Sequence, residues 1–334
     1  MTQAERTETQ TSAKAAPKRA IWQLLLQNQW FLLLIIVTII SIVTGSVNQK
    51  FYRQENLFSI LEQISVLGLV AAGATILIIA GNFDISVGAI IGLSACVMSI
   101  LMNKGLGEIP VAVLGILLCI GCATLNGAMS MAFKTPSFII SLATTGVYHG
   151  IALALTGGVI QTIYGKFEFI AGYDILGFFP LLFFISIMGY IFVHIILKYT
   201  RTGRRIFAVG SNPRAAFLAG IRVSWSTIGF FVLNGFLVGV AAVILLSRLG
   251  AALPSTGTGL ELRAIGAVVI GGVPITGGRG NVLGTFFGVL LMGIISNSLN
   301  MMRVNPYFQE VAYGALIILA VAISSIRYRI AASK

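Results

Sequence analysis

The residues that could carry chemistry in this chain are few and lie far apart. Its two histidines, His149 and His194, each lie in a separate apolar stretch without a neighbouring acid. A general acid or base must stand within hydrogen-bond reach of its reaction partner, so we favour packing or interfacial roles over a proton relay. Cys119 and Cys122 form a CxxC pair without further ligands, which favours packing over metal or redox chemistry. We therefore predict no catalytic residue, no metal site and no cofactor.

The sequence contains no motif for nucleotide binding either. No GxxxxGK[ST] phosphate loop occurs, so we do not expect this chain itself to bind and hydrolyse ATP in the P-loop manner. The formal charge is +12, but the basic residues are scattered between apolar stretches instead of forming one basic face. This pattern indicates membrane topology and argues against a nucleic-acid partner.

Composition indicates a polytopic, all-α membrane protein. Of the 334 residues 57% are hydrophobic and 10% are charged, and the mean hydropathy is +0.96, which leaves too little polar surface for a soluble globule. A crossing helix needs ~17–25 apolar residues. We count about ten such runs, or eight if 261–302 forms a re-entrant hairpin: 31–47, 57–80, 88–102, 109–133, 137–156, 178–198, 223–247, 261–273, 281–302 and 308–326.

Basic residues orient these spans. With ten crossings and both termini cytoplasmic, only seven of the 22 basic residues fall outside, as the positive-inside rule requires. The predicted organisation is a disordered cytoplasmic tail (1–20), a transmembrane domain (21–326) and a cytoplasmic C-terminal tail (327–334). The main cytoplasmic loop covers 198–222, and the main outer loop, 157–177, is the natural place to dock a partner. The outer basic residues are Lys50, Arg53, Lys104, Lys166, Arg248, Arg263 and Arg303.

The cytoplasmic loop from Lys198 to Arg222 contains six basic residues and no acidic one. It also carries a short helix signal, with Ser211, Asn212 and Pro213 at its start and Gly220 at its end. We interpret this helix as a surface that is presented to a cytoplasmic partner. The alternative is a solvated loop whose charge only fixes topology.

Asp84 lies between two spans in the stretch AGNFDISVGAIIG. Its carboxylate can cap the following helix through the N–H groups near Val87 and Gly88, an interaction that the helix dipole favours. We therefore predict that Asp84, Ser86 and Gly88 form a structural break, in preference to direct contact with a ligand.

Asparagines are the other polar points within the spans, at Asn126, Asn234, Asn297 and Asn300. An Asn side chain can hold helix to helix or bind the hydroxyl groups of a neutral solute, and the sequence leaves both open. The candidate substrate pathway consists of Asn126, His149, Asn234 and Asn297.

Three stretches together resemble the permease subunits of bacterial ABC importers for monosaccharides, a family of ribose, arabinose and galactose permeases related to autoinducer permeases. They are AGNFDISVGAIIGL (80–93), TRTGRRIFAVGSNPRAAFLAGI (200–221) and SRLGAALPSTGTGLELRAIGAVVIGGVPITGGRGNVLGTFFGVLLMG (247–293). The resemblance covers nearly the whole chain after the tail. Asn82, His149 and Pro274 depart from residues that are common in the family, which leaves the sugar preference open.

The resemblance implies the two-half architecture of ABC importers in the bacterial inner membrane. Two copies, or this chain with a paralogue, then form the pathway, while cytoplasmic ATPase subunits and a periplasmic or lipid-anchored sugar-binding protein dock on either side. Transport would proceed by alternating access that ATP binding drives. The ATPase coupling helix would consist of Ser211, Asn212, Pro213, Arg214, Phe217, Leu218 and Gly220.

Two other functions compete with this interpretation. An ion-gradient-driven secondary transporter normally has several intramembrane acids or half-helices at a midplane ion site. Here only Asp84 and Glu62 are candidate acids, although the Gly-rich breaks at 80–88 and 271–280 do fit half-helices. A non-transporting receptor or scaffold would use the cytoplasmic loop for docking and the spans only as an anchor.

Overall fold

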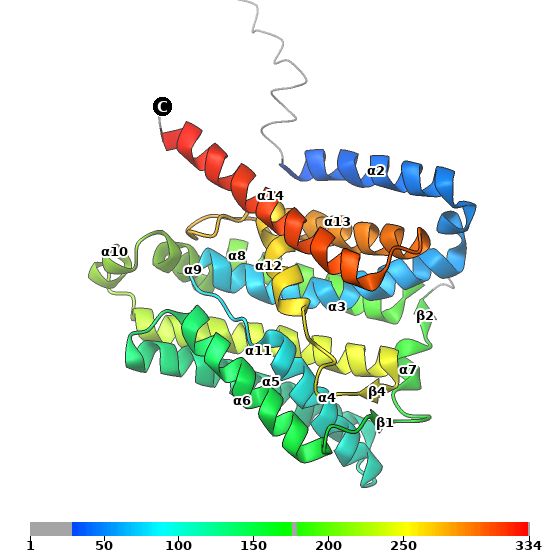
Figure 1. The fold of residues 1–334 in the computed structure, drawn as a ribbon. Helices are drawn as coiled ribbons and strands as arrows, with labels where there is room; N and C mark the ends of the chain where they lie inside the picture. The colour runs from blue at the N-terminus through cyan, green and yellow to red at the C-terminus, as the bar shows by residue number, and fades with distance from the viewer. Residues whose placement is uncertain (1–28, 176–178, 333–334) are drawn as a thin grey trace, which may run out of the picture.

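The computed structural model describes residues 29–175 and 179–332. The predicted tail 1–20, most of an interfacial helix that we expect at 22–30, and the last two residues lie outside the described part. Within it the chain is almost entirely helical (Figure 1). Seven of the described helices are long and apolar enough to cross a membrane. They are α2 (Gln29–Val47), α3 (Gln54–Ile79), α5 (Glu108–Phe133), α6 (Ser137–Thr156), α8 (Leu181–Tyr199), α11 (Val223–Leu249) and α13 (Val282–Met301).

The remaining elements are shorter or connect the long helices, apart from the C-terminal α14 (Pro306–Ala332). The helices are η1 (Gln49–Tyr52), α4 (Val87–Asn103), α7 (Glu168–Ala171), α9 (Arg201–Ser211), α10 (Pro213–Leu218) and α12 (Leu260–Ile270). The two-residue strands are β1 (Gln161–Thr162), β2 (Asp174–Ile175), β3 (Phe179–Pro180) and β4 (Ala251–Ala252). Strand β1 pairs antiparallel with β4, which ties the predicted outer loop to the end of α11.

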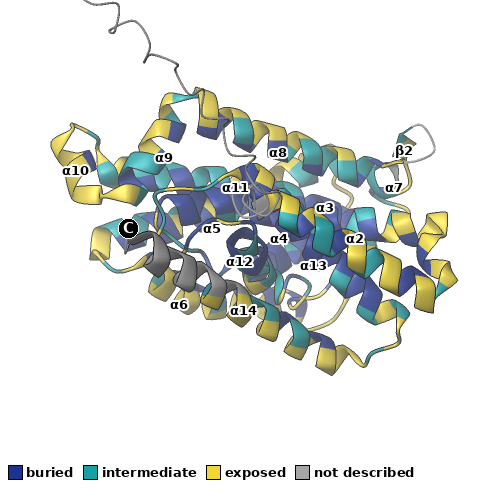
Figure 2. Cartoon of the chain, turned by 90° about the horizontal axis from the view of Figure 1, so that it is seen from above, coloured by how far each residue is buried: buried dark blue, intermediate teal, exposed yellow. Residues whose placement is uncertain are grey.

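Helices α3 and α11 form the centre of the bundle, and Figure 2 shows the buried residues gathered along them. The outer helices α5, α6 and α8 bury only one stripe each. In α5 the buried residues recur every three or four positions, at Val111, Gly115, Cys119, Ala123 and Asn126. Because the other positions of α5 are also largely apolar, its outer face suits lipid. The described fold is therefore that of a multi-pass membrane protein.

A pair of glycines brings α11 close to α5. A Cβ added at Gly235 would lie 2.8 Å from the Cα of Ile120, and one at Gly239 would lie 2.8 Å from the Cα of Ile116. Small residues four positions apart allow two membrane helices to approach this closely, which increases their van der Waals contact. The spacing Gly235-xxx-Gly239 thus permits the close contact between α5 and α11.

A helix lies at each of the ten predicted spans, but α12 is shorter than its predicted run. At 1.5 Å per residue its 11 residues reach about 16 Å, about half of the ~30 Å hydrocarbon core. Helix α13, with 20 residues, is long enough to cross on its own. The length of α13 fits the count of ten spans, and the choice between ten and eight stays a prediction.

Candidate functional site

The break between α3 and α4 has its backbone satisfied by a neighbouring helix. The N–H of Phe83 donates to Oγ of Ser137 at 2.9 Å, and the N–H of Ile85 donates to Oγ of Ser141 at 3.0 Å. Both serines lie on α6. Non-helical backbone at membrane depth is stable only when protein or water provides such partners. The two serines explain how the chain can leave helical geometry here.

Asp84 is buried in this break and accepts hydrogen bonds from three side chains. Its Oδ1 accepts from the backbone N–H of Ser86 at 3.0 Å, from Oγ of Ser86 at 2.6 Å and from Nδ2 of Asn126 at 3.4 Å. Its Oδ2 accepts from Nδ2 of Asn234 at 3.5 Å. The carboxylate therefore joins the break to α5 and α11. The predicted partners, Val87 and Gly88, are wrong in detail, because the carboxylate binds Ser86, the N-cap residue of α4.

The network extends from Asn126 to α6. Nδ2 of Asn126 also donates to Oγ of Ser86 at 2.7 Å, and its Oδ1 accepts from the hydroxyl of Tyr148 at 3.0 Å. The carbonyl oxygen of Cys122 also lies 3.0 Å from this hydroxyl, so the two acceptors share its single proton. We call Asp84, Ser86, Asn126, Tyr148 and Asn234 the Asp84 network. It fixes the geometry of the break against three different helices.

The four residues of the predicted substrate pathway do not share one exposed surface. Asn126 and Asn234 are 0% exposed and meet at Asp84, while His149 is half-buried on α6. Asn297 is buried on α13, where it forms a reciprocal amide pair with Asn56 of α3 at 2.8 and 3.1 Å. In this conformation the three asparagines hold helices together and do not face water, so their place in the pathway stays a prediction.

A second break, between α12 and α13, contacts the end of α3. The N–H of Gly278 donates to the carbonyl oxygen of Ile79 at 2.8 Å. Helix α9 reaches the same point, because a Cβ added at Gly210 would overlap that carbonyl oxygen. Next to it, Oγ of Ser211 donates to the carbonyl oxygen of Gly278 at 3.3 Å. The end of α9 therefore contacts both Gly-rich breaks.

Helix α9 was not predicted as a separate helix. Oγ1 of Thr200 accepts a hydrogen bond from the N–H of Gly203 at 3.1 Å and caps its start. Gly203, Ile206 and Val209 are buried at a spacing of three, while the arginines of this helix are mostly exposed. That period, preceded by a Thr cap, is the sequence signal that could have revealed this amphipathic helix.

Helix α10 matches the predicted short helix. Oδ1 of Asn212 accepts from the N–H groups of Arg214 and Ala215, both at 3.0 Å, and Pro213 occupies the first turn. Gly220, with a φ of +82°, ends it in a conformation that favours glycine. Residues 213–218 protrude at the end of the bundle that also carries the exposed arginines of α9 (Figure 1). We call this the basic end.

Two apolar side chains of α10 are exposed to solvent. Phe217 is 68% exposed and Leu218 is 82% exposed, while Arg214 beside them is also exposed. A helix of six residues gains little stability from its own hydrogen bonds, so neighbouring contacts must hold it. Exposed apolar side chains on such a helix are typical of a surface that a partner protein covers.

Comparison with known proteins supports a transport role. The family described as "Branched-chain amino acid transport system / permease component" matches residues 56–321. The chain belongs to this family. It is therefore a permease component of a membrane transport system, and the stretches 80–93, 200–221 and 247–293 all lie within the matched region.

Individual relatives extend the similarity over most of the chain. The ribose import permease protein of Bacillus subtilis (strain 168) is 36% identical over 293 residues, 86% of this chain and 89% of the relative. The D-allose transport system permease protein of Escherichia coli (strain K12) is 32% identical over 94% of this chain and 97% of the relative. The autoinducer 2 import system permease protein of Shigella flexneri is 31% identical over 91% of this chain and 89% of the relative. No solved structure matches the chain.

Proposed function

We propose that the chain forms the translocation pathway of an ATP-driven ABC importer for a monosaccharide or a similar small polar solute. The observation that carries this proposal is the similarity over nearly the full length to permeases named for ribose, D-allose and autoinducer 2. The apolar, uncovered surface of α10 supports it, because a permease without a phosphate loop needs a contact with a separate ATPase.

The ATPase contact that we propose is α10 itself. Phe217 and Leu218 would insert into an apolar cleft of the ATPase, while Arg214 would meet an acidic rim. Movement of α10 would pass through α9 to the contact of Gly210 with Ile79, and so to both Gly-rich breaks. Alternating access then arises because ATP-bound and ATP-free partners favour different pore states.

We further propose the topology and the assembly. Ten crossings with both termini cytoplasmic would place the basic end in the cytoplasm of a bacterial inner membrane. In this arrangement α12 and the preceding segment 250–259 make one discontinuous crossing. A periplasmic or lipid-anchored sugar-binding protein would dock at the opposite end, and a second permease copy or a paralogue would complete the pathway.

Membrane vesicles provide the test. The permease is reconstituted with its ATPase and binding protein, and uptake of labelled D-ribose, D-allose and other monosaccharides is measured with and without ATP. We expect uptake of at least one sugar only when ATP and the ATPase are both present. Uptake that an ion gradient drives without ATP would instead identify a secondary transporter, and no uptake of any sugar would favour a receptor or scaffold.

A further inference from the structure

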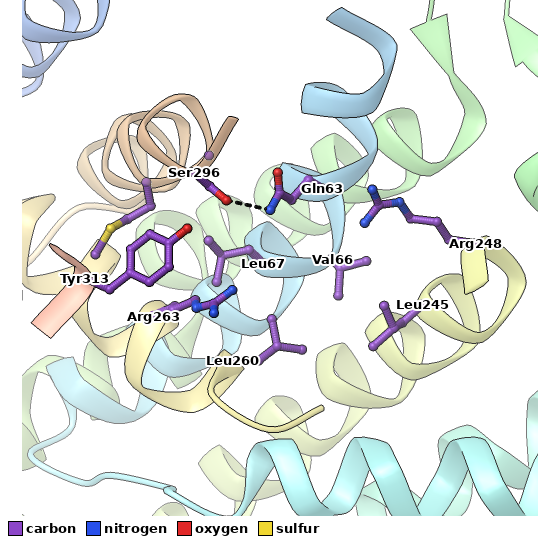
Figure 3. A pocket seen from close by; sticks show the side chains of 11 residues that line it. Gln63, Val66, Leu67, Leu245, Arg248, Leu260, Arg263, Ser296 and Tyr313 are labelled. Carbon is purple, nitrogen blue, oxygen red and sulfur yellow. Dashed lines mark hydrogen bonds between the residues drawn. The ribbon is translucent and has the colours of Figure 1, made fainter. Parts of the chain in front are cut away.

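A small cavity with an apolar lining and a few polar groups lies in the half of the bundle remote from α9 and α10. Arg248, on its wall, is the second-to-last residue of α11, and Ser296 lies in the last two turns of α13. The cavity has a volume of about 140 Å³. Because one water needs ~10–15 Å³ by this measure, there is room for a small solute. Its walls come from α3, α11, α12, α13 and α14 (Figure 3).

The lining combines an apolar floor with a polar rim. Leu67, Leu245 and Leu260 belong to the floor, and Figure 3 shows the polar side chains around them. The rim groups are an amide, a hydroxyl, a phenol and two guanidinium groups: Gln63, Ser296, Tyr313, Arg248 and Arg263. Sites for small ligands commonly pair an apolar lining with a few convergent polar groups. A sugar, with its C–H face and its hydroxyl groups, matches both parts.

Both guanidinium groups are neutralised by nearby carboxylates. Nε of Arg248 donates to Oε2 of Glu62 at 3.1 Å, and Nη2 of Arg263 donates to Oε1 of Glu310. The two ion pairs carry no net charge together, so the cavity offers no excess charge to an anion or a cation. A neutral solute fits this balance, and each guanidinium keeps further N–H donors for it.

Some of the polar groups retain unused hydrogen-bonding capacity. Nε2 of Gln63 donates to Oγ of Ser296 at 2.9 Å, a contact that fixes the amide at the rim. The guanidinium of Arg263 lies 4.5 Å from the ring centre of Tyr313, and its buried Nε finds no hydrogen-bond partner among the described residues. The donors that can meet a ligand in the cavity are the remaining guanidinium N–H groups and the hydroxyl of Tyr313.

We propose that this cavity is the subsite where the permease first holds the monosaccharide after delivery, which rests on the proposed function. The half of the bundle remote from the basic end is where a sugar from a binding protein would enter. Arg248 and Arg263 are both counted among the outer basic residues, so the cavity lies near the surface that a binding protein would meet.

Protection of introduced cysteines tests the subsite. Gln63→Cys and Leu260→Cys are made in a permease that lacks the three native cysteines, and both are treated with a water-soluble thiol reagent in the assembled importer. The two positions lie on different helices, so if one variant fails to insert into the membrane, the other still tests the subsite. Phe133→Cys, exposed at the end of α5 and away from the outer loop, is the control. The added ligands are the sugar that the vesicles import, its enantiomer and L-leucine.

We expect both cavity cysteines to react and the imported sugar to slow the reaction at least fivefold. The enantiomer and L-leucine should leave the rate unchanged, and no ligand should protect Phe133→Cys. Unchanged labelling in a permease that imports the sugar overturns the subsite while the proposed function stands. Protection by L-leucine, or absence of any labelling at both cavity positions, overturns it too. Failure of every sugar in the vesicle assay rejects the proposed function instead.

Discussion

The N–H of Gly278 donates a hydrogen bond to the carbonyl oxygen of Ile79 at 2.8 Å. This bond joins the break 271–280 to the last residue of α3, directly before the break 80–88. The last carbonyl groups of a helix lack partners within it, so the bond satisfies one of them. Because Gly210 of α9 lies against the same carbonyl, a shift of α9 must move both breaks or break this contact.

A side chain at Gly210 should therefore disturb the junction. In Gly210→Ala the new Cβ would overlap the carbonyl oxygen of Ile79, so α9 must move away from the end of α3. Gly229→Ala on α11 is the matched control, since nothing lies within 4 Å of its new Cβ. We expect Gly210→Ala to lose most of the ATP-driven uptake in vesicles, and Gly229→Ala to keep it. Equal uptake by both variants would show that α9 does not transmit movement through this contact.

The Asp84 network should contribute to stability. Asp84→Ala leaves buried partners on Ser86, Asn126 and Asn234 without their acceptor, and each unpaired group costs ~1–3 kcal/mol. The purified variant should therefore unfold at a clearly lower temperature than the wild type in detergent. Asp174→Ala removes an exposed carboxylate and should melt like the wild type. If Asp84→Ala melts normally but no longer transports, Asp84 belongs to the pathway instead.

Solvent access distinguishes a structural role from a pathway role for the two central amides. Asn126→Cys and Asn234→Cys, without the native cysteines, should react slowly with a water-soluble thiol reagent, because both positions are fully buried. Phe217→Cys on α10 should react quickly and serves as the control. Rapid labelling of both buried positions during ATP turnover would place them in the pathway, as the sequence suggested.

The reciprocal pair of Asn56 and Asn297 predicts non-additive effects. Asn56→Ala or Asn297→Ala alone leaves one buried amide without its partner, whereas the double variant removes both. The free energy lost by the double variant should be smaller than the sum of the two single losses, with a coupling of ~0.5–3 kcal/mol. Denaturant unfolding of the four proteins measures it. Additive losses would contradict a direct interaction.

The sequence predicted the helices better than their contacts. Apolar runs located ten helices, and the Asn212-Pro213 signal located α10, because both depend on local chemistry. The partners of Asp84 lie on α5 and α11, and no local pattern specifies which helix faces which. Helix α9 was missed because its arginines gave the segment the charge of a basic loop. The spacing of three between its buried residues was the weaker signal.

The contact with the ATPase depends on α10, and its apolar side chains should dominate. Truncating a buried side chain at an interface often costs more than ~1 kcal/mol, whereas a charge at the rim mainly changes on-rate and salt dependence. Arg214→Ala should therefore release the ATPase only at raised ionic strength. Co-purification across a salt series checks this, and loss of the ATPase at low salt would make Arg214 a central contact.

The most direct measurement compares Phe217→Ala with Phe133→Ala. The two phenylalanines are 68% and 67% exposed, and Phe133 ends α5, outside α10. Each variant is inserted and purified, and both the ATPase that co-purifies and its sugar-stimulated hydrolysis are measured. Phe217→Ala should lose the ATPase and the stimulation, while Phe133→Ala should keep both. If Phe217→Ala retains full co-purification and full stimulation, α10 is not the coupling helix and the loop serves only membrane topology.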